Sequence, residues 1–278
     1  MDYSEEYTTL LRHMVTVTNS LVGKPLGNEP WFKYAEGVSM KLLAHTSAAY
    51  VLYQGTRLKY DDRSMLNFVD YSSITVLTRA ALETFLAFYF IFCDAPTVDE
   101  KRFRFWCWDF AGFIDRQGFP IFSDEGVQLL EVEAAMLSEA KLKIESHQIF
   151  RAMTVKQQKK IIEEGQWRLG LSWSAIAVRA GFERNYFKGI YSHFCGYAHT
   201  NRLSIAQIQQ ATNPSIQREL AEASLGFCMV TMANFLFAYA SLFPLADQAF
   251  KGDSKAYETA LVWREISQNI HKDIKVIS

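Results

Sequence analysis

The chain has 278 residues, of which 49% are hydrophobic and only six are proline, a composition that excludes extensive disorder away from the termini. Its formal net charge of −1 excludes the overall basic field of general nucleic-acid-binding proteins. The four cysteines form no C-x-x-C motif, and the acidic N-terminus has no apolar segment of the secretory type. We therefore expect a cytoplasmic protein without a disulfide framework.

Hydrophobic residues recur at helical spacing along most of the chain, and no alternating pattern of useful length predicts strands. Glycine and proline separate these stretches. The predicted helices span residues 3–20, 30–54, 64–93, 98–116, 123–147, 154–165, 171–181, 183–199, 214–243 and 245–271. We predict an all-α multi-helix bundle in which residues 1–278 form a single domain, with an N-terminal helical pair (1–60) packing on a core (64–278).

The segment 64–93 contains no glycine or proline and is apolar on every side, which is typical of a helix at the centre of a core. Four polar residues interrupt it at i, i+3, i+7 and i+11, namely Ser72, Thr75, Arg79 and Glu83. A charged pair in a core helix is costly unless both members find partners. This stripe is therefore a candidate site, in which Arg79 and Glu83 either bind an anion or form a structural network.

The segment 223–246 contains no charged residue and is long enough to span a bilayer. Serine, threonine and asparagine side chains dilute its hydrophobicity, and no cluster of lysine or arginine flanks it. We interpret it as part of a core helix that packs against the 64–93 helix, with a membrane span as the alternative. Helices 64–93 and 214–243 should therefore be the two long buried helices, and no membrane partner is expected.

Residues 186–200 concentrate aromatic, hydroxyl and imidazole groups on one predicted helix. Ser192, Cys195 and His199 would share one face, whereas His193 lies about 120° away from His199 and could not bind the same metal. Cys195 and His199 could supply half of a zinc site, but no second half is evident, so neither a metal nor a cofactor is expected. His199 is either an interface residue or an acid–base group.

The common motifs for phosphate loops, dinucleotide folds, serine hydrolases and zinc proteases do not occur in the sequence. The lysine-rich run KQQKK at residues 156–160 is typical of a solvated helix face. Contact of this run with an RNA backbone is the alternative interpretation.

Three features occur in a recognisable order: the R-x-x-x-E pair in an apolar helix, the Trp-led short helix WSAIAVRAGF, and the pattern Y-x-x-x-x-Y-S-x-x-x-x-x-A-H. This order resembles an uncharacterised family of bacterial all-helical proteins, a domain of unknown function, over roughly residues 70–200. The resemblance implies no activity. It implies that five residues are signature positions, and we take these as the candidate catalytic residues: Arg79, Glu83, Tyr191, Ser192 and His199.

More distantly, the helical architecture resembles HEPN domains, many of which are metal-independent ribonucleases that act as dimers. Their signature is R-x(4–6)-H on one helix, but here the histidine after Arg184 is His193, nine residues later. Arg79 with His199 is the better pair for acid–base catalysis on a phosphodiester. The resemblance implies a homodimeric effector of a bacterial toxin or defence system that cleaves RNA or binds a nucleotide. The alternative is a non-catalytic interaction or dimerisation module with a structural Arg–Glu–His network.

Overall fold

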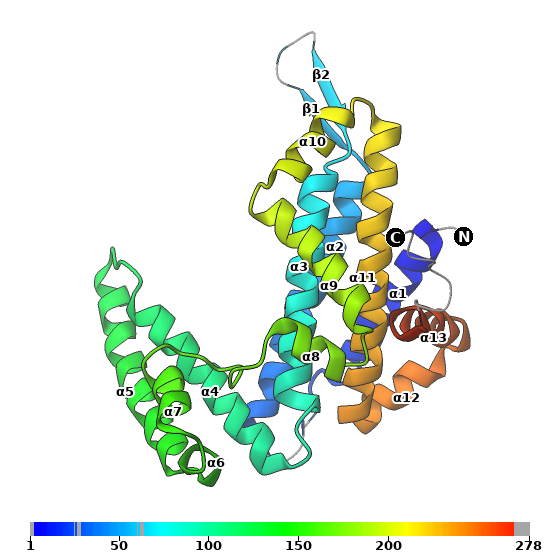
Figure 1. Ribbon diagram of the computed structural model, residues 1–278. Coiled ribbons are helices and arrows are strands. Elements are labelled where there is room, and N and C mark those ends of the chain that lie inside the picture. The colour runs from blue at the N-terminus through cyan, green and yellow to red at the C-terminus, as the bar shows by residue number, and fades with distance from the viewer. Residues whose placement is uncertain (1–2, 25, 27–28, 60, 62–63, 270–278) are drawn as a thin grey trace. The chain divides into compact units, whose positions relative to one another are not determined.

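The computed structural model describes residues 3–24, 26, 29–59, 61 and 64–269, and Figure 1 shows its helices and strands. It is 78% helical, with thirteen α-helices and one two-stranded sheet among the described residues, so the all-α prediction is confirmed. The chain divides into two compact units, unit 1 (residues 1–89 and 177–278) and unit 2 (residues 90–176). That the whole chain forms a single domain stays a prediction.

Unit 1 contains the N-terminal and C-terminal helices of the chain. They are α1 (Tyr3–Asn19), α2 (Lys33–Tyr53), α3 (Tyr71–Phe88), α9 (Arg184–Ala198), α10 (Arg202–Gln210), α11 (Pro214–Leu242), α12 (Pro244–Gly252) and α13 (Ser254–Asn269). Unit 2 contains α4 (Val98–Gln117), α5 (Asp124–Ser146), α6 (Gln148–Arg151) and α7 (Val155–Ile162). The chain leaves unit 1 within a π-helical turn, Tyr89–Cys93, and returns within α8 (Trp173–Arg179).

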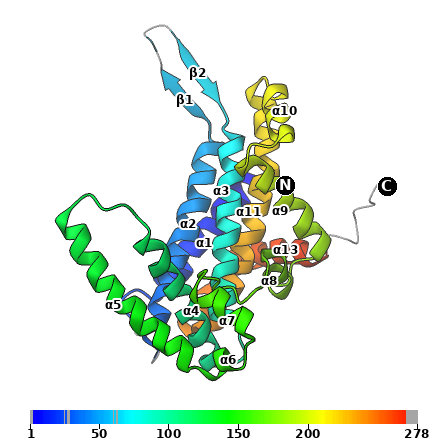
Figure 2. The same cartoon turned by 60° about the vertical axis from the view of Figure 1, so that its left-hand side comes forward.

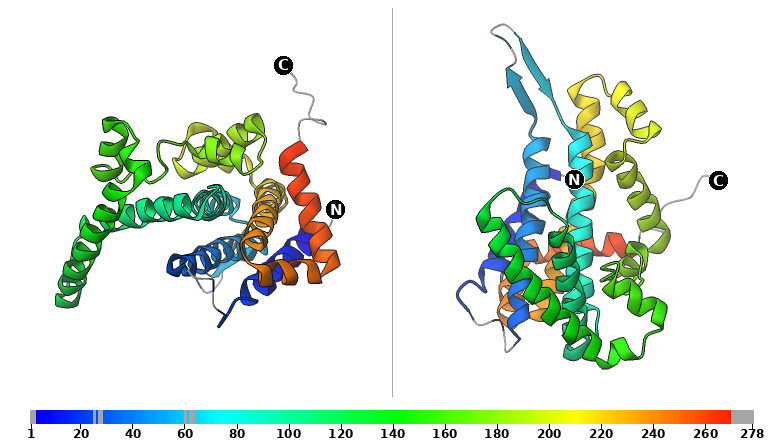
Figure 3. Two further views of the ribbon diagram at one scale, coloured as in Figure 1. Left: turned by 90° about the horizontal axis from the view of Figure 1, so that it is seen from below. Right: turned by 90° about the vertical axis from the view of Figure 1, so that its left-hand side faces the viewer.

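Helix α11 is the centre of unit 1, as the view in Figure 3 shows. It contacts α1, α2, α3, α12 and α13, and most of its side chains from Ala221 to Ala240 are buried. Helix α3 lies between α2 and α11 (Figure 2) and buries most of its own side chains. Because both helices are apolar nearly all the way round, each requires neighbours on several sides. The prediction that these are the two long core helices is confirmed.

Hydroxyl groups join α3 to α11 within this core. The hydroxyl oxygens of Thr75 and Ser224 lie 2.9 Å apart, and the Thr78 hydroxyl lies 3.2 Å from the Cys228 sulfur. Both threonines also donate to backbone carbonyls one turn earlier in α3, so neither threonine hydroxyl is left without a partner. The polar stripe predicted for this helix is therefore divided, because Thr75 faces α11 while Arg79 and Glu83 face elsewhere.

By length and composition, two helical segments are apolar enough to cross a membrane: Tyr71–Cys93 and Pro214–Leu242. In the structure, 56% and 78% of their most apolar windows are buried. Core helices of soluble proteins pass the same test, so the cytoplasmic localisation stays a prediction.

Residues 64–70 are not helical, contrary to the prediction that the central helix begins at residue 64. Strands β1 (Thr56–Lys59) and β2 (Met65–Phe68) form an antiparallel hairpin in which Thr56 pairs with Phe68. The Asp70 carboxylate accepts a hydrogen bond from the Ser73 amide and caps α3, so the helix begins only after it. The side chains of β2 are as apolar as those of α3, so the sequence pattern does not show where the strand ends and the helix begins.

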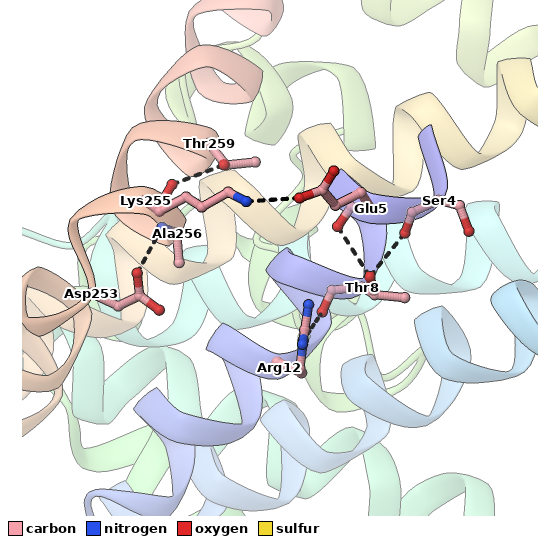
Figure 4. Close-up of polar contacts among 8 residues, drawn as sticks. All are labelled: Ser4, Glu5, Thr8, Arg12, Asp253, Lys255, Ala256 and Thr259. Carbon is pink, nitrogen blue, oxygen red and sulfur yellow. Dashed lines mark hydrogen bonds and ion pairs between the residues drawn. The ribbon is translucent and has the colours of Figure 1, made fainter. Parts of the chain in front are cut away.

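Aspartate and asparagine caps also explain two further differences. The predicted helix 245–271 is interrupted because the Asp253 carboxylate accepts from the Ala256 amide and starts α13 anew, while residues 270 and 271 lie outside the described residues (Figure 4). The same figure shows Lys255 of α13 paired with Glu5 of α1 at 2.7 Å. Helix α10, which was not predicted, starts at the capping residue Asn201.

Unit 2 contains a buried arginine that the sequence analysis did not single out. Arg104 is only 5% exposed, and its guanidinium donates to Asp94 (2.6 Å), Glu100 (2.6 Å) and the Phe90 carbonyl (2.9 Å). The guanidinium also lies 4.3 Å from the centroid of the Phe90 ring. These contacts connect the start of α4 to the π-helical turn before it.

We expect Arg104→Ala to lower the free energy of unfolding by about 3–5 kcal/mol, because it leaves the Asp94 carboxylate buried without its cation. Lys141→Ala is the control, since Lys141 pairs with Glu145 at 3.9 Å on the solvent-exposed side of α5 and should cost about 0.5 kcal/mol or less. Chemical denaturation followed by circular dichroism measures both values. Equal effects of the two variants would contradict the prediction.

Candidate functional site

Four of the five candidate residues meet where α3 contacts α9. The Arg79 Nε donates to Glu83 Oε1 at 2.9 Å, and the Tyr191 hydroxyl donates to the same carboxylate oxygen at 2.6 Å. The Arg79 Nη1 lies 3.4 Å from His199 Nε2. The Arg79 guanidinium also lies 5.6 Å from the centroid of the Tyr191 ring. Arg79 and Glu83 thus face the helix that ends at His199, and the proposal that these residues are catalytic stays a prediction.

The group lies at the rim of the core. The side chains of Arg79 and Glu83 are 21% and 28% exposed, and His199 is exposed at the end of α9. An arginine in this position keeps contact with solvent while its Nε is held by a carboxylate. A ligand could therefore reach the terminal nitrogens of Arg79 and the His199 ring without opening the core.

The contact between Arg79 and His199 defines the state of the imidazole. A guanidinium has only donor groups, so His199 Nε2 must accept and cannot carry a hydrogen. The ring hydrogen of the neutral imidazole is then on Nδ1. In this arrangement His199 Nε2 is held as an acceptor beside the Arg79 guanidinium.

Tyr191 is held as a hydrogen-bond donor. Burial raises the pKa of its phenol, and the hydrogen bond to Glu83 raises that pKa further because it favours the protonated form. The ring stacks on Phe187, with 5.3 Å between the centroids. Tyr191 therefore remains a neutral phenol that keeps the Glu83 carboxylate in place.

Ser192 does not join the group, contrary to the expectation that it shares the site with His199. Its side chain is exposed, and none of the described contacts links it to Arg79, Glu83 or His199. The reason is that His199 follows the last residue of α9 and has a non-helical backbone (φ −109°, ψ 14°), so helical spacing from Ser192 does not fix its direction. Tyr191, one residue before Ser192, occupies the side of α9 that faces α3.

His193 belongs to the packing of α9 rather than to the site. Its ring lies 5.1 Å from that of Tyr197, edge to face, and burial lowers its pKa. The Tyr197 hydroxyl donates to Gln207 of α10 at 2.8 Å. Within the part of the chain that the structure describes, no three histidine, cysteine or acidic side chains are grouped as metal ligands would be.

The position of His199 depends on the corner between α9 and α10, whose residues the sequence analysis did not assign. The Asn201 amide donates to the Gly196 carbonyl at 2.9 Å, and the Asn201 side chain caps α10 by accepting from the Ser204 amide. Thr200 between them has φ +54°, a conformation that is unfavourable for a β-branched residue. In the sequence, Gly196 followed five residues later by the capping residue Asn201 was the pattern that could have predicted this corner.

No protein-family model matches the chain, and neither the curated proteins nor the solved structures contain a match. The resemblance to the family of unknown function and to HEPN domains therefore has no support from these comparisons and stays a prediction.

We expect Gly196→Ala to destabilise the corner. A Cβ at this position would collide with the Asn201 side chain, so the asparagine would have to move and leave its cap, at a cost of about 1–2 kcal/mol. Gly189→Ala in the same helix is the control, because nothing lies within 4 Å of its added Cβ. Alanine is the better helix former, so Gly189→Ala should stabilise by about 0.5–1 kcal/mol. Thermal and chemical unfolding give both values, and the same sign for the two variants would refute this account.

Proposed function

We propose that the protein is a metal-independent ribonuclease whose active site is the group Arg79, Glu83, Tyr191 and His199. The observation that carries the proposal is the 3.4 Å contact between the Arg79 guanidinium and Nε2 of His199 at a solvent-exposed rim. A base beside a fixed cation is the combination that attack by a 2′-hydroxyl on phosphorus requires.

In the proposed reaction, the Arg79 Nη1 exchanges His199 for a phosphoryl oxygen when the RNA binds, which frees the lone pair of His199 Nε2. His199 Nε2 then removes the proton of a ribose 2′-hydroxyl as its oxygen attacks the adjacent phosphorus. The bond from phosphorus to the 5′-oxygen breaks, and this oxygen takes a proton from water. The products are a 2′,3′-cyclic phosphate and a 5′-hydroxyl end. Arg79 donates to the phosphoryl oxygens, on which negative charge accumulates in the transition state.

Glu83 and Tyr191 act as positioning residues in this proposal. Glu83 Oε1 holds the Nε edge of Arg79 and leaves the terminal nitrogens directed toward the phosphate. Tyr191 fixes Glu83 through its 2.6 Å hydrogen bond. Ser192 has no role in the reaction. An RNA-cleaving enzyme of this kind would suit the effector role expected from the resemblance.

The second candidate is a non-catalytic network that fixes α9 on α3. One observation favours it: a single oxygen of Glu83 accepts hydrogen bonds both from its own helix and from α9. A carboxylate with this double function also occurs in purely structural networks. In that case His199 would add little, because it lies at the exposed edge of the network.

We expect His199→Ala to reduce cleavage of a labelled single-stranded RNA by about 10²-fold or more, since general acid–base groups typically contribute this much. The thermal unfolding midpoint should remain near that of the parent protein, because His199 is exposed. His193→Ala, a substitution of the same kind on the same helix, should retain cleavage. Activity should persist in EDTA, and a 2′-deoxy substitution at the cleaved position should abolish it.

Two outcomes would contradict the ribonuclease. One is an absence of RNA cleavage by the purified full-length protein. The other is cleavage that persists in both His199→Ala and Arg79→Ala. If neither variant affects cleavage or nucleotide binding and Arg79→Ala only destabilises the fold, the structural network is the better description.

A further inference from the structure

Helix α5 of unit 2 buries little of its surface. Of its 23 residues, only Ala140 and Ile144 are buried, and both contribute to the core of unit 2. Figures 1 and 2 show α5 as one of the long helices of the molecule. On the side that faces α4, Leu137 adds to this core and Glu133 pairs with Arg116 at 3.2 Å, while the other sides of α5 are largely exposed.

One stripe of α5 carries a regular pattern with alternating spacings of four and three residues. Its members are Glu125, Leu129, Val132, Met136, Glu139 and Lys143. This alternation is the a/d pattern of a coiled-coil seam. The three central side chains, Leu129, Val132 and Met136, are 46%, 54% and 48% exposed. A seam with an apolar centre that is open to solvent is a surface for another helix.

The charges at the ends of the stripe identify the partner. Glu125 lies near the start of α5, and Lys143 lies near its end, where it pairs with Glu139 of the same helix at 2.7 Å and stays 45% exposed. If a second α5 packs antiparallel about a point between Val132 and Met136, each Glu125 meets Lys143 of the second copy. Val132 then meets Met136 of the second copy, and Leu129 packs beside Glu139 of that copy. Every layer pairs an a position with a d position, as antiparallel coiled coils do.

A parallel pair would place like charges together at three levels of the seam: Glu125, Glu139 and Lys143 would each face their own counterpart. Such juxtapositions are unfavourable in coiled coils. We propose that α5 is the homodimer interface of this protein and pairs antiparallel with α5 of a second copy. Because the interface uses one helix from each copy, we expect a concentration-dependent dimer rather than a permanent one.

The first experiment is sedimentation velocity, with light scattering, on the full chain from ~1 to ~100 µM, the range in which a modest interface of this kind dissociates. The parent protein should approach the mass of two chains as its concentration rises. Val132→Glu should remain at the mass of one chain, 31.9 kDa. Val127→Glu is the matched control: Val127 is 46% exposed on the opposite side of α5, so this variant should dimerise like the parent.

The second experiment is a charge exchange, which requires no apolar substitution. Glu125→Lys and Lys143→Glu should each weaken the dimer by about tenfold or more, because each creates two like-charge contacts. The double variant should recover the affinity, since an antiparallel pair again joins opposite charges. A parallel pair would not recover, because its like residues still meet.

Three results would overturn the proposal. They are a parent protein that stays at 31.9 kDa throughout the range, a Val132→Glu variant that dimerises normally, and a double charge variant that stays as weak as the single variants. Circular dichroism of each variant shows whether the fold is retained. If Val132→Glu does not fold, the charge exchange decides alone. None of these readouts depends on RNA cleavage, so the dimer and the ribonuclease are tested separately.

Discussion

The fold of unit 1 depends on the need of α3 and α11 to be covered on almost every side. Helix α11 takes α1, α2, α12 and α13 as further neighbours, and α3 takes α2 and α9. Thr75 and Ser224 show how close the two axes come, because such short side chains bond directly across the interface. Only a narrow strip of α3 remains for charged groups, and that strip lies under α9. The location of the candidate site is thus a consequence of how the core is closed.

The covering of α3 by its neighbours also explains why the site is polar at one end and apolar at the other. Arg79 and Glu83 are far enough from the core centre to keep 21% and 28% of their side-chain surface in solvent. Tyr191 places its ring on Phe187, toward the core, and its hydroxyl on Glu83. His199 completes the group from the exposed end of α9. A half-buried carboxylate thereby orients a cation whose other side remains accessible to a ligand.

The sequence was sufficient for the helical class, for the two core helices and for the encounter of Arg79 with His199. That encounter followed from one requirement, that a charged pair in an apolar helix needs polar partners. The hairpin of β1 and β2 was missed because its apolar side chains continue those of α3. Arg104 was missed because its carboxylates, Asp94 and Glu100, belong to a polar turn and a first helical turn that resemble ordinary surface. Ser192 was misplaced because His199 lies beyond the last residue of α9, where helical spacing no longer relates the directions of the two side chains.

The division of the chain has a consequence for the order in which the protein can form during synthesis. Unit 2 is continuous, from residue 90 to 176, whereas unit 1 combines residues 1–89 with residues 177–278. On the ribosome, unit 2 is therefore fully synthesised before α11. Until α11 is synthesised, α3 lacks the helix that covers one of its sides in the folded protein. During that interval its apolar surface is available to chaperones and to other nascent chains. The contacts between α3 and α11 join residues about 150 positions apart in the sequence. A long loop must close before these contacts form, and this requirement slows folding.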